Sequence, residues 1–398
     1  YKTIFKLLQI KQSDLTDPNS CTVIGAPSGV IPIENSNTFL HWLEKENPLK
    51  IAFNCYRIVV SEELHKLIIF NRKVNIIENA FPYLHMKKRI IFLLKSSLLI
   101  FTALLLCIFG RWQTAFLSKD LILLFYFQCL HNDQKSRAYI FFSHDLASRP
   151  LWTFLAEKEQ RFIVNVFYAS SYTLFSYGNN DVASDIKLPS ICLANWPEYW
   201  VQNDSFHRIL SSLITGSPIV RTVGAFPFTD SGQLIPVIKG RNIFVFDVDP
   251  SNDFIEYTKN GYIIPNFTDE ILIAFWKDLY ICAKELNVQL IHKRKRNDPV
   301  TSQKYRELLS IMSQEKNNYM EISCHLNTFE LIKKNIHIPA ISLPFTSTAE
   351  IGDAFGGKHI YYNTLEKIEN PEKHSCNIPT IHGIDNLKLW LTDCFNDN

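Results

Sequence analysis

The sequence predicts an α/β protein built from two Rossmann-like domains. Short apolar runs alternate with amphipathic stretches of helical length, and this alternation is most regular in the C-terminal half. The 398 residues are enough for two domains, each with its own core. Strands that alternate with helices favour parallel sheets, because a crossover helix returns the chain to the end of the sheet at which the preceding strand began.

The N-terminal half combines expected strands with one hydrophobic helical segment. An apolar run from Cys21 to Ile24 leads into a turn that contains glycine and proline. Further strands are expected at 50–54, 139–142 and 162–168, and helices at 61–70 and 152–161. A segment with Gly232 and Pro236 separates the halves, which predicts domains at 1–235 and 236–398.

Residues 90–109 form the one stretch with membrane-like hydrophobicity. They are about long enough to cross a bilayer, and the basic run 87–89 precedes them. Lys95 interrupts the stretch, and residues 112–130 continue its apolar character. A helix pair at a membrane interface is the favoured interpretation, while a buried hairpin and a membrane span stay open.

The C-terminal half alternates regularly between strands and helices. Strands are expected at 242–248, 288–292, 319–324, 338–343 and 358–362, and helices at 268–286, 302–313, 327–334 and 347–355. In an open parallel sheet, ligands bind beyond the carboxyl ends of the strands. Unusual residues that follow these strands are therefore the candidates for a binding site.

Composition narrows the class of protein. The net charge of +2 does not predict nucleic-acid binding. Nine cysteines without a C-x-x-C pair fit buried thiols in a reducing cytoplasm. The histidines show no H-E-x-x-H or similar spacing, so neither a metal nor another cofactor is expected. Residues 1–10 carry two lysines but lack the apolar core and the cleavage site of a signal peptide.

Two carboxylates follow the strand expected at 242–248. Asp247 and Asp249 are two residues apart, and alternation along a strand places them on the same face. They are candidates for a catalytic base or nucleophile, or for hydrogen bonds to sugar hydroxyls. The alternative is structural, because an aspartate at a strand end also caps a loop or pairs with a basic neighbour.

A basic run follows the next strand. Lys293, Arg294, Lys295 and Arg296 come directly after His292. Charge of this kind suits a diphosphate or a nucleoside monophosphate, and arginine adds bidentate geometry. A solvated basic loop is the alternative, but the position directly after an apolar strand favours phosphate binding.

A third strand end carries three hydroxyl residues. Thr346, Ser347 and Thr348 open the helix expected at 347–355, and the free N–H groups of a helix start attract phosphate. The same residues are also ordinary helix caps, so a structural role stays open. Tyr361, on the strand that follows this helix, is expected near the same cleft.

The sequence at 341–349, Ile-Ser-Leu-Pro-Phe-Thr-Ser-Thr-Ala, resembles the signature of the bacterial polysaccharide biosynthesis PFTS-motif proteins. Further stretches fit this family in the same order: Arg149 to Thr153, Tyr168 to Ser170, Phe246 to Val248 with Pro250, the basic run with Tyr305, and Tyr361 with Tyr362. The resemblance runs from roughly residue 80 to the end. One position departs from the family pattern, because Asn363 stands where an acidic residue is expected.

This resemblance implies a GT-B-like glycosyltransferase of bacterial surface polysaccharide synthesis, with two Rossmann-like domains that face a cleft. The C-terminal domain would bind a nucleotide-sugar donor, and the family's similarity to transferases of CMP-activated acidic sugars implies a CMP-linked one. The N-terminal domain would hold a glycan or lipid-linked glycan acceptor, and the reaction would need no metal. The expected location is the cytoplasm, or the cytoplasmic face of the inner membrane.

Two histidines complete the candidate site. His325 follows the strand expected at 319–324 and either faces the nucleotide or serves the next helix locally. His144 follows the strand expected at 139–142 and is a candidate base for an acceptor hydroxyl, although an ordinary loop histidine is the simpler interpretation.

Two other functions compete with this interpretation. The first is a non-catalytic glycan- or membrane-binding assembly protein that kept the fold and lost the chemistry. The second, a nucleotide-sugar epimerase, is less favoured because the sequence has no G-x-G-x-x-G turn.

Overall fold

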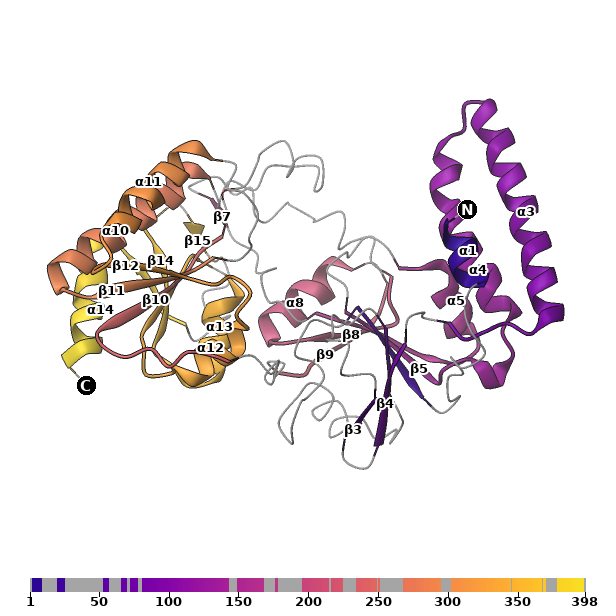
Figure 1. The fold of residues 1–398 in the computed structure, drawn as a ribbon, viewed down its shortest axis with the longest axis horizontal. Coiled ribbons are helices and arrows are strands. Elements are labelled where there is room, and N and C mark those ends of the chain that lie inside the picture. Colours follow the sequence, from indigo (N-terminus) through magenta and orange to yellow (C-terminus); the bar gives the residue numbers. More distant parts are fainter. Residues whose placement is uncertain are drawn as a thin grey trace.

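The computed structural model contains two α/β units that lie side by side along the long axis of the molecule (Figure 1). The structure describes residues 2–8, 20–25, 53–56, 66–69, 72–77, 81–142, 149–167, 176–177, 195–214, 216–224, 234–248, 250, 268–294, 302–344, 346–366, 368–369 and 378–396. Each unit is built on its own mainly parallel sheet. The predicted fold class, α/β with two Rossmann-like units, is confirmed.

The first unit has an eight-stranded sheet in the order β3-β4-β2-β1-β5-β6-β8-β9. Its strands are β1 (Cys21–Ile24), β2 (Phe53–Tyr56), β3 (Lys66–Ile69), β4 (Arg72–Ile77), β5 (Ala138–Phe142), β6 (Phe162–Val166), β8 (Glu198–Val201) and β9 (Ile219–Thr222). Neighbouring strands are parallel except β3 and β4, which are antiparallel. The helix expected at 61–70 is wrong over residues 66–69, because the apolar run at 67–69 favours a strand and finds a partner in β4.

Helices of the first unit pack around an aromatic core. They are α1 (Lys2–Leu8), α3 (Met86–Ile108), α4 (Gln113–Cys129), α5 (Leu151–Lys158) and α8 (Asp204–Leu213), with a 3-10 turn at Asn132–Gln134. The ring of Trp152 on α5 lies 4.9 Å from Tyr139 and 5.1 Å from Phe127, between centroids. Arg149 donates to Thr153 Oγ1 at 2.8 Å and fixes the start of α5. The Arg149 to Thr153 stretch therefore has a structural role in this core.

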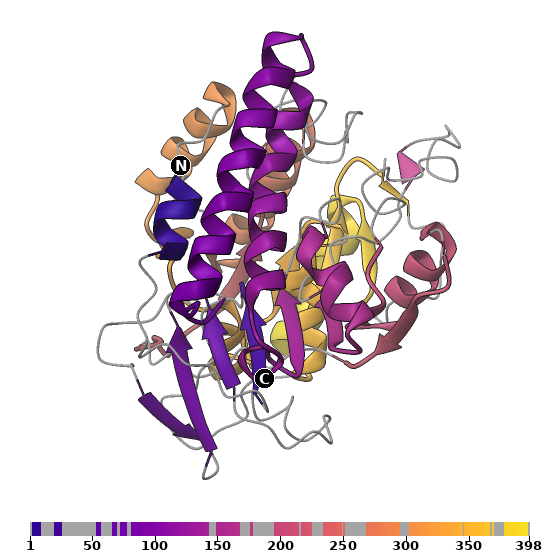
Figure 2. The same cartoon turned by 90° about the vertical axis from the view of Figure 1, so that its right-hand side faces the viewer.

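Helices α3 and α4 form a hairpin that projects beyond the first sheet (Figures 1 and 2). By length and composition α3 is long and apolar enough to cross a membrane, with a mean hydropathy of 2.4. Its inward-facing buried residues are Phe92 and Ser96, whereas most of its other apolar side chains are exposed. Helix α3 is therefore not a core helix of this unit.

The second unit has a six-stranded parallel sheet in the order β12-β11-β10-β13-β14-β16. Its strands are β10 (Asn242–Phe246), β11 (Gln289–Lys293), β12 (Tyr319–Ile322), β13 (Ala340–Ser342), β14 (His359–Asn363) and β16 (Thr380–His382). Its helices are α10 (Asp269–Leu286), α11 (Gln303–Gln314), α12 (Thr328–Lys334), α13 (Ser347–Ala354) and α14 (Ile384–Asn396). The elements expected between 242 and 362 are confirmed in type and order, with ends shifted by a few residues.

The two faces of the second sheet carry different helices. Helices α10, α11 and α14 pack with buried residues such as Trp276 on one face, and α12 and α13 pack with residues such as Ile332 on the other. A short antiparallel ribbon of β7 (Ser176–Tyr177) and β15 (Ile368–Glu369) joins segments that are far apart in the chain. The boundary expected at 235/236 lies between β9 and β10, and Ile235 and Ile238 pack in the core of the second unit.

Candidate functional site

Three strands of the second sheet carry the predicted site at their carboxyl ends. Strand β10 lies between β11 and β13, and its last residue, Phe246, pairs with Lys293 on one side and Ser342 on the other. Asp247, the basic run and the hydroxyl turn therefore follow neighbouring strands at one edge of the sheet. The expectation that the fold brings these three segments together is confirmed.

Asp247 lies inside the protein directly after β10, with 6% of its surface exposed. Its Oδ1 lies 3.0 Å from Nε2 of His292, and its Oδ2 accepts a hydrogen bond from Trp276 Nε1 at 3.0 Å. The hydroxyl of Tyr305 also donates to Oδ2. Side chains from β11, α10 and α11 thus converge on one carboxylate.

This network favours an ionised Asp247. Burial alone would raise the pKa of the carboxyl, but His292, Tyr305 and Trp276 stabilise the carboxylate and lower the pKa below its ordinary value. Burial and the adjacent carboxylate raise the pKa of Tyr305. The phenol therefore stays protonated and donates a hydrogen bond to Asp247. His292 satisfies both of its neighbours when Nε2–H donates to Asp247 and Nδ1 accepts from the Tyr319 hydroxyl at 2.7 Å.

Both oxygens of Asp247 are thus engaged by groups within the protein. The carboxylate points into the core between the sheet and the helices α10 and α11, where Trp276 and Tyr305 are also buried. A satisfied buried network of this kind fixes the elements that it joins. The prediction of Asp247 as the catalytic carboxylate stays a prediction, and its contacts favour an anchoring role. Asp249 lies outside the described residues.

Lys293 is the buried cation of the basic run. Its Nζ donates to the carbonyl oxygen of Cys324 at 3.3 Å, and burial lowers the pKa of the ammonium. Because Lys293 and Ser342 both pair with Phe246, they share one face of the sheet, the face covered by α12 and α13. An anion beside Lys293 would offset the cost of burying this charge.

Arg294 leaves the sheet on the other side. It is half-buried, and its Nη1 lies 3.8 Å from Oε1 of Glu321 on β12. Lys293 and Arg294 therefore lie on opposite faces of the sheet. The remaining members of the basic run, Lys295 and Arg296, lie outside the described residues.

The hydroxyl turn connects β13 with α13. Thr346 is the N-cap residue of α13, but its Oγ1 donates to the carbonyl of Leu343 at 2.9 Å instead of capping the helix. Thr348 Oγ1 lies 2.9 Å from Ser342 Oγ, which fastens the first turn of α13 to the end of β13. The hydroxyl of the buried Tyr361 on β14 donates a hydrogen bond to the carbonyl of Thr346 at 3.1 Å, which stabilises the turn.

Helix α13 therefore begins without a side-chain cap. Three other helices of this unit, α10, α11 and α12, are capped by Thr268, Ser302 and Asn327. Ser347, the first residue of α13, is half-buried, and its hydroxyl has no partner among the described residues. No described side chain caps the first N–H groups of α13, and the helix dipole favours an anion there.

A buried histidine sets the distance between α13 and the sheet. His359 on β14 is 7% exposed, and burial lowers its pKa to about 4. A Cβ atom at Gly352 of α13 would lie 2.0 Å from the His359 ring, so this position requires glycine. Gly357 also lies against this ring, because a Cβ atom at this position would lie 2.9 Å from His359. The helix can lie close to β14 because these side chains are absent.

The remaining predicted residues have separate positions. His325 is exposed in the loop after β12, where its backbone N–H donates to Ser323 Oγ at 3.3 Å. This loop follows a strand at the same edge of the sheet as Lys293, so a role toward a ligand stays a prediction for His325. His144, the candidate base of the first unit, lies outside the described residues.

One contact joins the motif helix to the first unit. Asn203 Nδ2 donates to Glu350 Oε2 at 3.1 Å, and Glu350 lies in the first turn of α13. Figure 1 shows α8, which follows Asn203, on the side of the first unit that faces α13. The start of α13 therefore lies where the two units meet.

Several residues that shape this region were not predicted from the sequence. Trp276 and Tyr319 have the appearance of ordinary core residues, and no local pattern connects them with Asp247. For Asn203 the sequence does contain a signal, because an asparagine directly before Asp204 is a typical N-cap and could have indicated the start of α8. Its second contact, with Glu350, depends on how the two units lie together.

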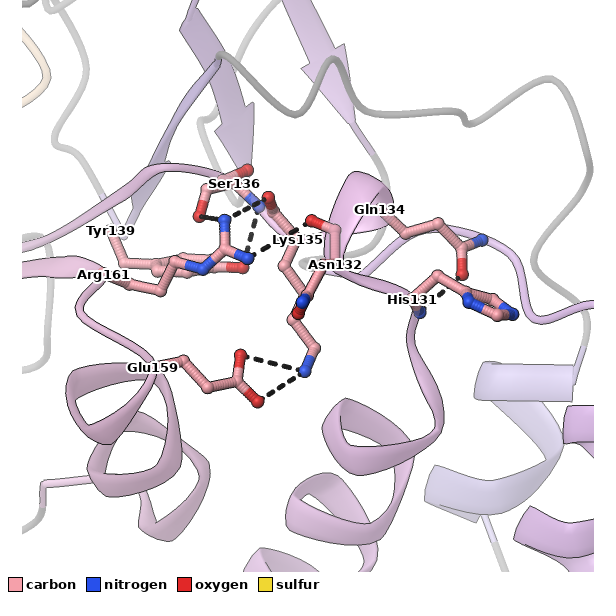
Figure 3. Close-up of polar contacts among 8 residues, drawn as sticks. All are labelled: His131, Asn132, Gln134, Lys135, Ser136, Tyr139, Glu159 and Arg161. Carbon is pink, nitrogen blue, oxygen red and sulfur yellow. Dashed lines mark hydrogen bonds and ion pairs between the residues drawn. The ribbon is translucent and has the colours of Figure 1, made fainter.

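A second polar cluster lies in the first unit (Figure 3). Lys135 Nζ donates to both carboxylate oxygens of Glu159, at 2.7 and 2.9 Å, and Arg161 Nη1 donates to the carbonyl of Lys135 at 3.0 Å. Arg161 also reaches the carbonyl of Asn132 at 3.2 Å. These residues precede β5 and β6, at the amino ends of the strands, whereas ligands of such sheets bind at the carboxyl ends. The cluster fits a structural clamp.

Comparisons with known proteins give one family and several distant structures. A family model described as "Polysaccharide biosynthesis PFTS motif protein" matches residues 100–391. A comparison with curated proteins gives no match.

The solved structures that resemble this chain differ greatly from it in sequence. The wall teichoic acid polymerase TagF, solved with CDPG, shares 9% identity with a TM-score of 0.45, over 99% of this chain and 87% of that chain. The UDP-GlcNAc 2-epimerase of Methanocaldococcus jannaschii shares 10% identity with a TM-score of 0.46, over 95% and 93%. Arabidopsis thaliana UGT89C1, complexed with UDP-L-rhamnose, shares 11% identity with a TM-score of 0.47, over 95% and 90%. None of the three identifies the donor, the acceptor or the reaction of this chain.

Proposed function

The chain belongs to the family of polysaccharide biosynthesis PFTS motif proteins, and we propose that it is a glycosyltransferase with a nucleotide-activated sugar donor. The observation that carries this proposal is the uncapped start of α13. The Pro-Phe-Thr-Ser sequence of residues 344–347, the PFTS motif, ends there, at the carboxyl ends of parallel strands. The helix start, the Ser347 hydroxyl and the buried ammonium of Lys293 on the same face of the sheet are groups that can bind a phosphate.

In the proposed reaction, an acceptor hydroxyl attacks the anomeric carbon of the donor sugar. The bond between this carbon and the phosphate oxygen breaks, the electron pair leaves with the nucleotide, and the hydroxyl proton passes to a base. Negative charge develops on the leaving phosphate, and the start of α13 with Lys293 would stabilise it. Because β13 and β11 hold these phosphate-binding groups in place, the groups need little reorganisation during the reaction. The proposal includes no metal ion.

The candidates for the base and for further phosphate contacts lie outside the described residues. Asp249 and His144 are the candidates for the base, since each follows a strand at a carboxyl end. Lys295 and Arg296 are the candidates for further phosphate contacts. Asp247 would hold the ends of β10 and β11 in register, so that Lys293 and the loop after β10 keep their positions.

We propose a CMP-linked donor and a glycan or lipid-linked glycan acceptor. One helix start and one buried ammonium on the same face of the sheet suit a single phosphate better than a diphosphate. The acceptor would bind in the first unit, whose helix α8 lies next to α13 through the contact of Asn203 with Glu350.

A panel of nucleotides tests the donor. CMP should raise the thermal midpoint of the full chain more than UMP, UDP or GDP at equal concentration, because a ligand of the native state stabilises it by mass action. A midpoint that rises with UDP and stays unchanged with CMP would exclude the CMP-linked donor. No response to any nucleotide would contradict the glycosyltransferase proposal itself.

One observation favours a second function. Both oxygens of Asp247 are engaged inside the protein, which fits a non-catalytic glycan- or membrane-binding assembly protein that retained the fold. Donor turnover separates the two functions. A transferase releases nucleotide from the donor when a glycan acceptor is added, whereas an assembly protein binds the glycan without nucleotide release.

A further inference from the structure

The outer face of α3 carries an apolar stripe that no described part of the chain covers. The stripe residues recur at intervals of three and four, which places them on one side of the helix. They are Ile90, Leu94, Leu98, Phe101, Leu105 and Ile108. Their exposure ranges from 40% at Leu105 to 77% at Ile108, so the α3 stripe faces solvent along its whole length.

The opposite side of α3 already has its packing partner. Phe92 is fully buried, and its ring centroid lies 5.1 Å from that of Tyr126 on α4. Lys95 also turns toward α4, because its Nζ donates to Gln128 Oε1 at 3.5 Å and lies 5.7 Å from the centre of the Phe125 ring. The charge of Lys95 therefore does not interrupt the α3 stripe.

Charge around the stripe is of one sign. Residues 79–119 contain no aspartate or glutamate. Of their basic residues, Lys87, Arg111 and Lys119 are exposed, whereas Lys95 turns toward α4 and Arg89 donates to the carbonyl of Leu8. An apolar helix face bordered by lysine and arginine is the pattern that binds anionic lipid surfaces, since the apolar side chains enter the interface and the cations meet the headgroups.

We propose that the α3 stripe lies in the interface of a bilayer that contains anionic lipids, with α3 parallel to the membrane plane. Figure 2 shows the hairpin rising past the first sheet, and Figure 1 shows it on the side of the first unit away from the second. The inference goes beyond the proposed function and does not depend on it.

A second copy of the chain fits the stripe less well. Two copies that share this face through two-fold symmetry would bring the basic residues of 87–119 close together without a carboxylate in the segment to compensate them. Binding to an anionic surface has no such cost.

The path of the chain disfavours a span. Helix α4 returns alongside α3 and leads into β5, so both ends of the hairpin lie on the side of the sheet. To cross the bilayer, the hairpin would carry Lys95 of α3 and Lys119 and Asp120 of α4 into the hydrocarbon, where charges are costly.

Flotation of the full chain with lipid vesicles tests the proposal. Vesicles of phosphatidylcholine with about a third of phosphatidylglycerol should bind the chain at least about tenfold more tightly than phosphatidylcholine alone. The double variant Leu98→Asp/Phe101→Asp should weaken binding to the anionic vesicles by at least about tenfold, because it places two carboxylates on the stripe. Both positions are exposed, so the fold tolerates the change.

The matched control is Ile311→Asp/Leu389→Asp on α11 and α14, where the replaced side chains are 59% and 64% exposed. This control should bind the vesicles like the unchanged chain. Equal binding of the unchanged chain to both kinds of vesicle would overturn the role of charge. If the Leu98→Asp/Phe101→Asp variant binds the anionic vesicles as tightly as the unchanged chain, the α3 stripe is not the membrane-binding surface. A third outcome is that the unchanged chain does not bind vesicles but forms a dimer in light scattering, and that the Leu98→Asp/Phe101→Asp variant is monomeric. This result would show that a second copy, and not a membrane, covers the stripe.

Discussion

Asn203 and Glu350 connect the two α/β units, since Asn203 Nδ2 donates to Glu350 Oε2 at 3.1 Å. The same asparagine caps α8, because its Oδ1 accepts a hydrogen bond from the backbone N–H of Phe206 at 2.8 Å. One side chain therefore positions the start of α8 and contacts the first turn of α13. The position of the PFTS motif is in this way coupled to the first unit.

The variant Asn203→Asp separates these two roles. Aspartate caps a helix as well as asparagine does, so α8 should keep its stability. The new carboxylate would face the carboxylate of Glu350, and the contact between the units should break. Small-angle scattering should then show a larger radius of gyration, and the double variant Asn203→Asp/Glu350→Gln should restore it because the introduced side-chain amide can donate to the new carboxylate. If the single variant keeps its original dimensions, the Asn203 contact does not hold the units together.

Ser347→Ala should weaken nucleotide binding while the stability stays nearly unchanged. The hydroxyl has no described partner and does not cap α13, so its removal costs the fold little. A hydrogen bond to a charged phosphate contributes about 1.5–3 kcal/mol, so the Kd for the best nucleotide should rise at least about tenfold in calorimetric titration.

The matched control is Ser302→Ala, because Ser302 caps α11 by accepting from the N–H of Tyr305. This variant should lose about 1 kcal/mol of stability and keep its nucleotide affinity. If both serine variants lose stability and neither loses nucleotide affinity, the start of α13 is a structural turn, and the phosphate site lies elsewhere.

Asp247→Asn distinguishes an anchoring carboxylate from a catalytic one. Substitution removes the charge that His292, Trp276 and Tyr305 surround, and loss of one partner in a buried charged network costs about 3 kcal/mol. Urea unfolding should show this loss, with nucleotide affinity falling as the strand end loosens. An exposed aspartate, Asp353, provides the control, since Asp353→Asn should leave stability unchanged. A variant that lacks transfer activity but unfolds like the unchanged chain would show that Asp247 acts in catalysis.

The arrangement of the second unit could be predicted because its signals are local. Between 242 and 362 each strand is a short apolar run and each helix follows a start signal, and the rules for parallel connections leave few ways to assemble them. Strand ends at Asp247, Lys293 and Ser342 therefore meet as expected. The resemblance read from residues 341–349 is confirmed by the family match over 100–391.

The side-chain environment of the site could not be predicted in the same way. Trp276 and Tyr305 are 29 and 58 residues away from Asp247 in the chain, and nothing in the sequence pairs them with it. Whether a carboxylate after a strand turns to a cleft or to the core depends on these distant donors. Hydrophobicity likewise does not distinguish a buried helix from an exposed one, so the sequence left the environment of 90–109 open and the structure shows α3 exposed.

His359 should make the second unit sensitive to mild acid. In the folded chain burial lowers the pKa of this histidine to about 4, from an ordinary value of 6.5. Between these two values the unfolded chain binds a proton that the folded chain does not, so stability is complete above about pH 6.5 and falls as the pH drops toward 4. A difference of this size corresponds to a loss of up to about 3 kcal/mol.

The variant His359→Phe removes this titration and keeps a ring beside Gly352. Urea unfolding between pH 4.5 and 7 should therefore give a flatter stability profile for His359→Phe than for the unchanged chain. The control is His325→Gln, which replaces an exposed histidine in the loop after β12. Since the His359 ring supports α13, nucleotide affinity of the unchanged chain should fall in the same pH range, and it should fall less in His359→Phe. Profiles of equal steepness for the unchanged chain and His359→Phe would assign the acid sensitivity to other groups.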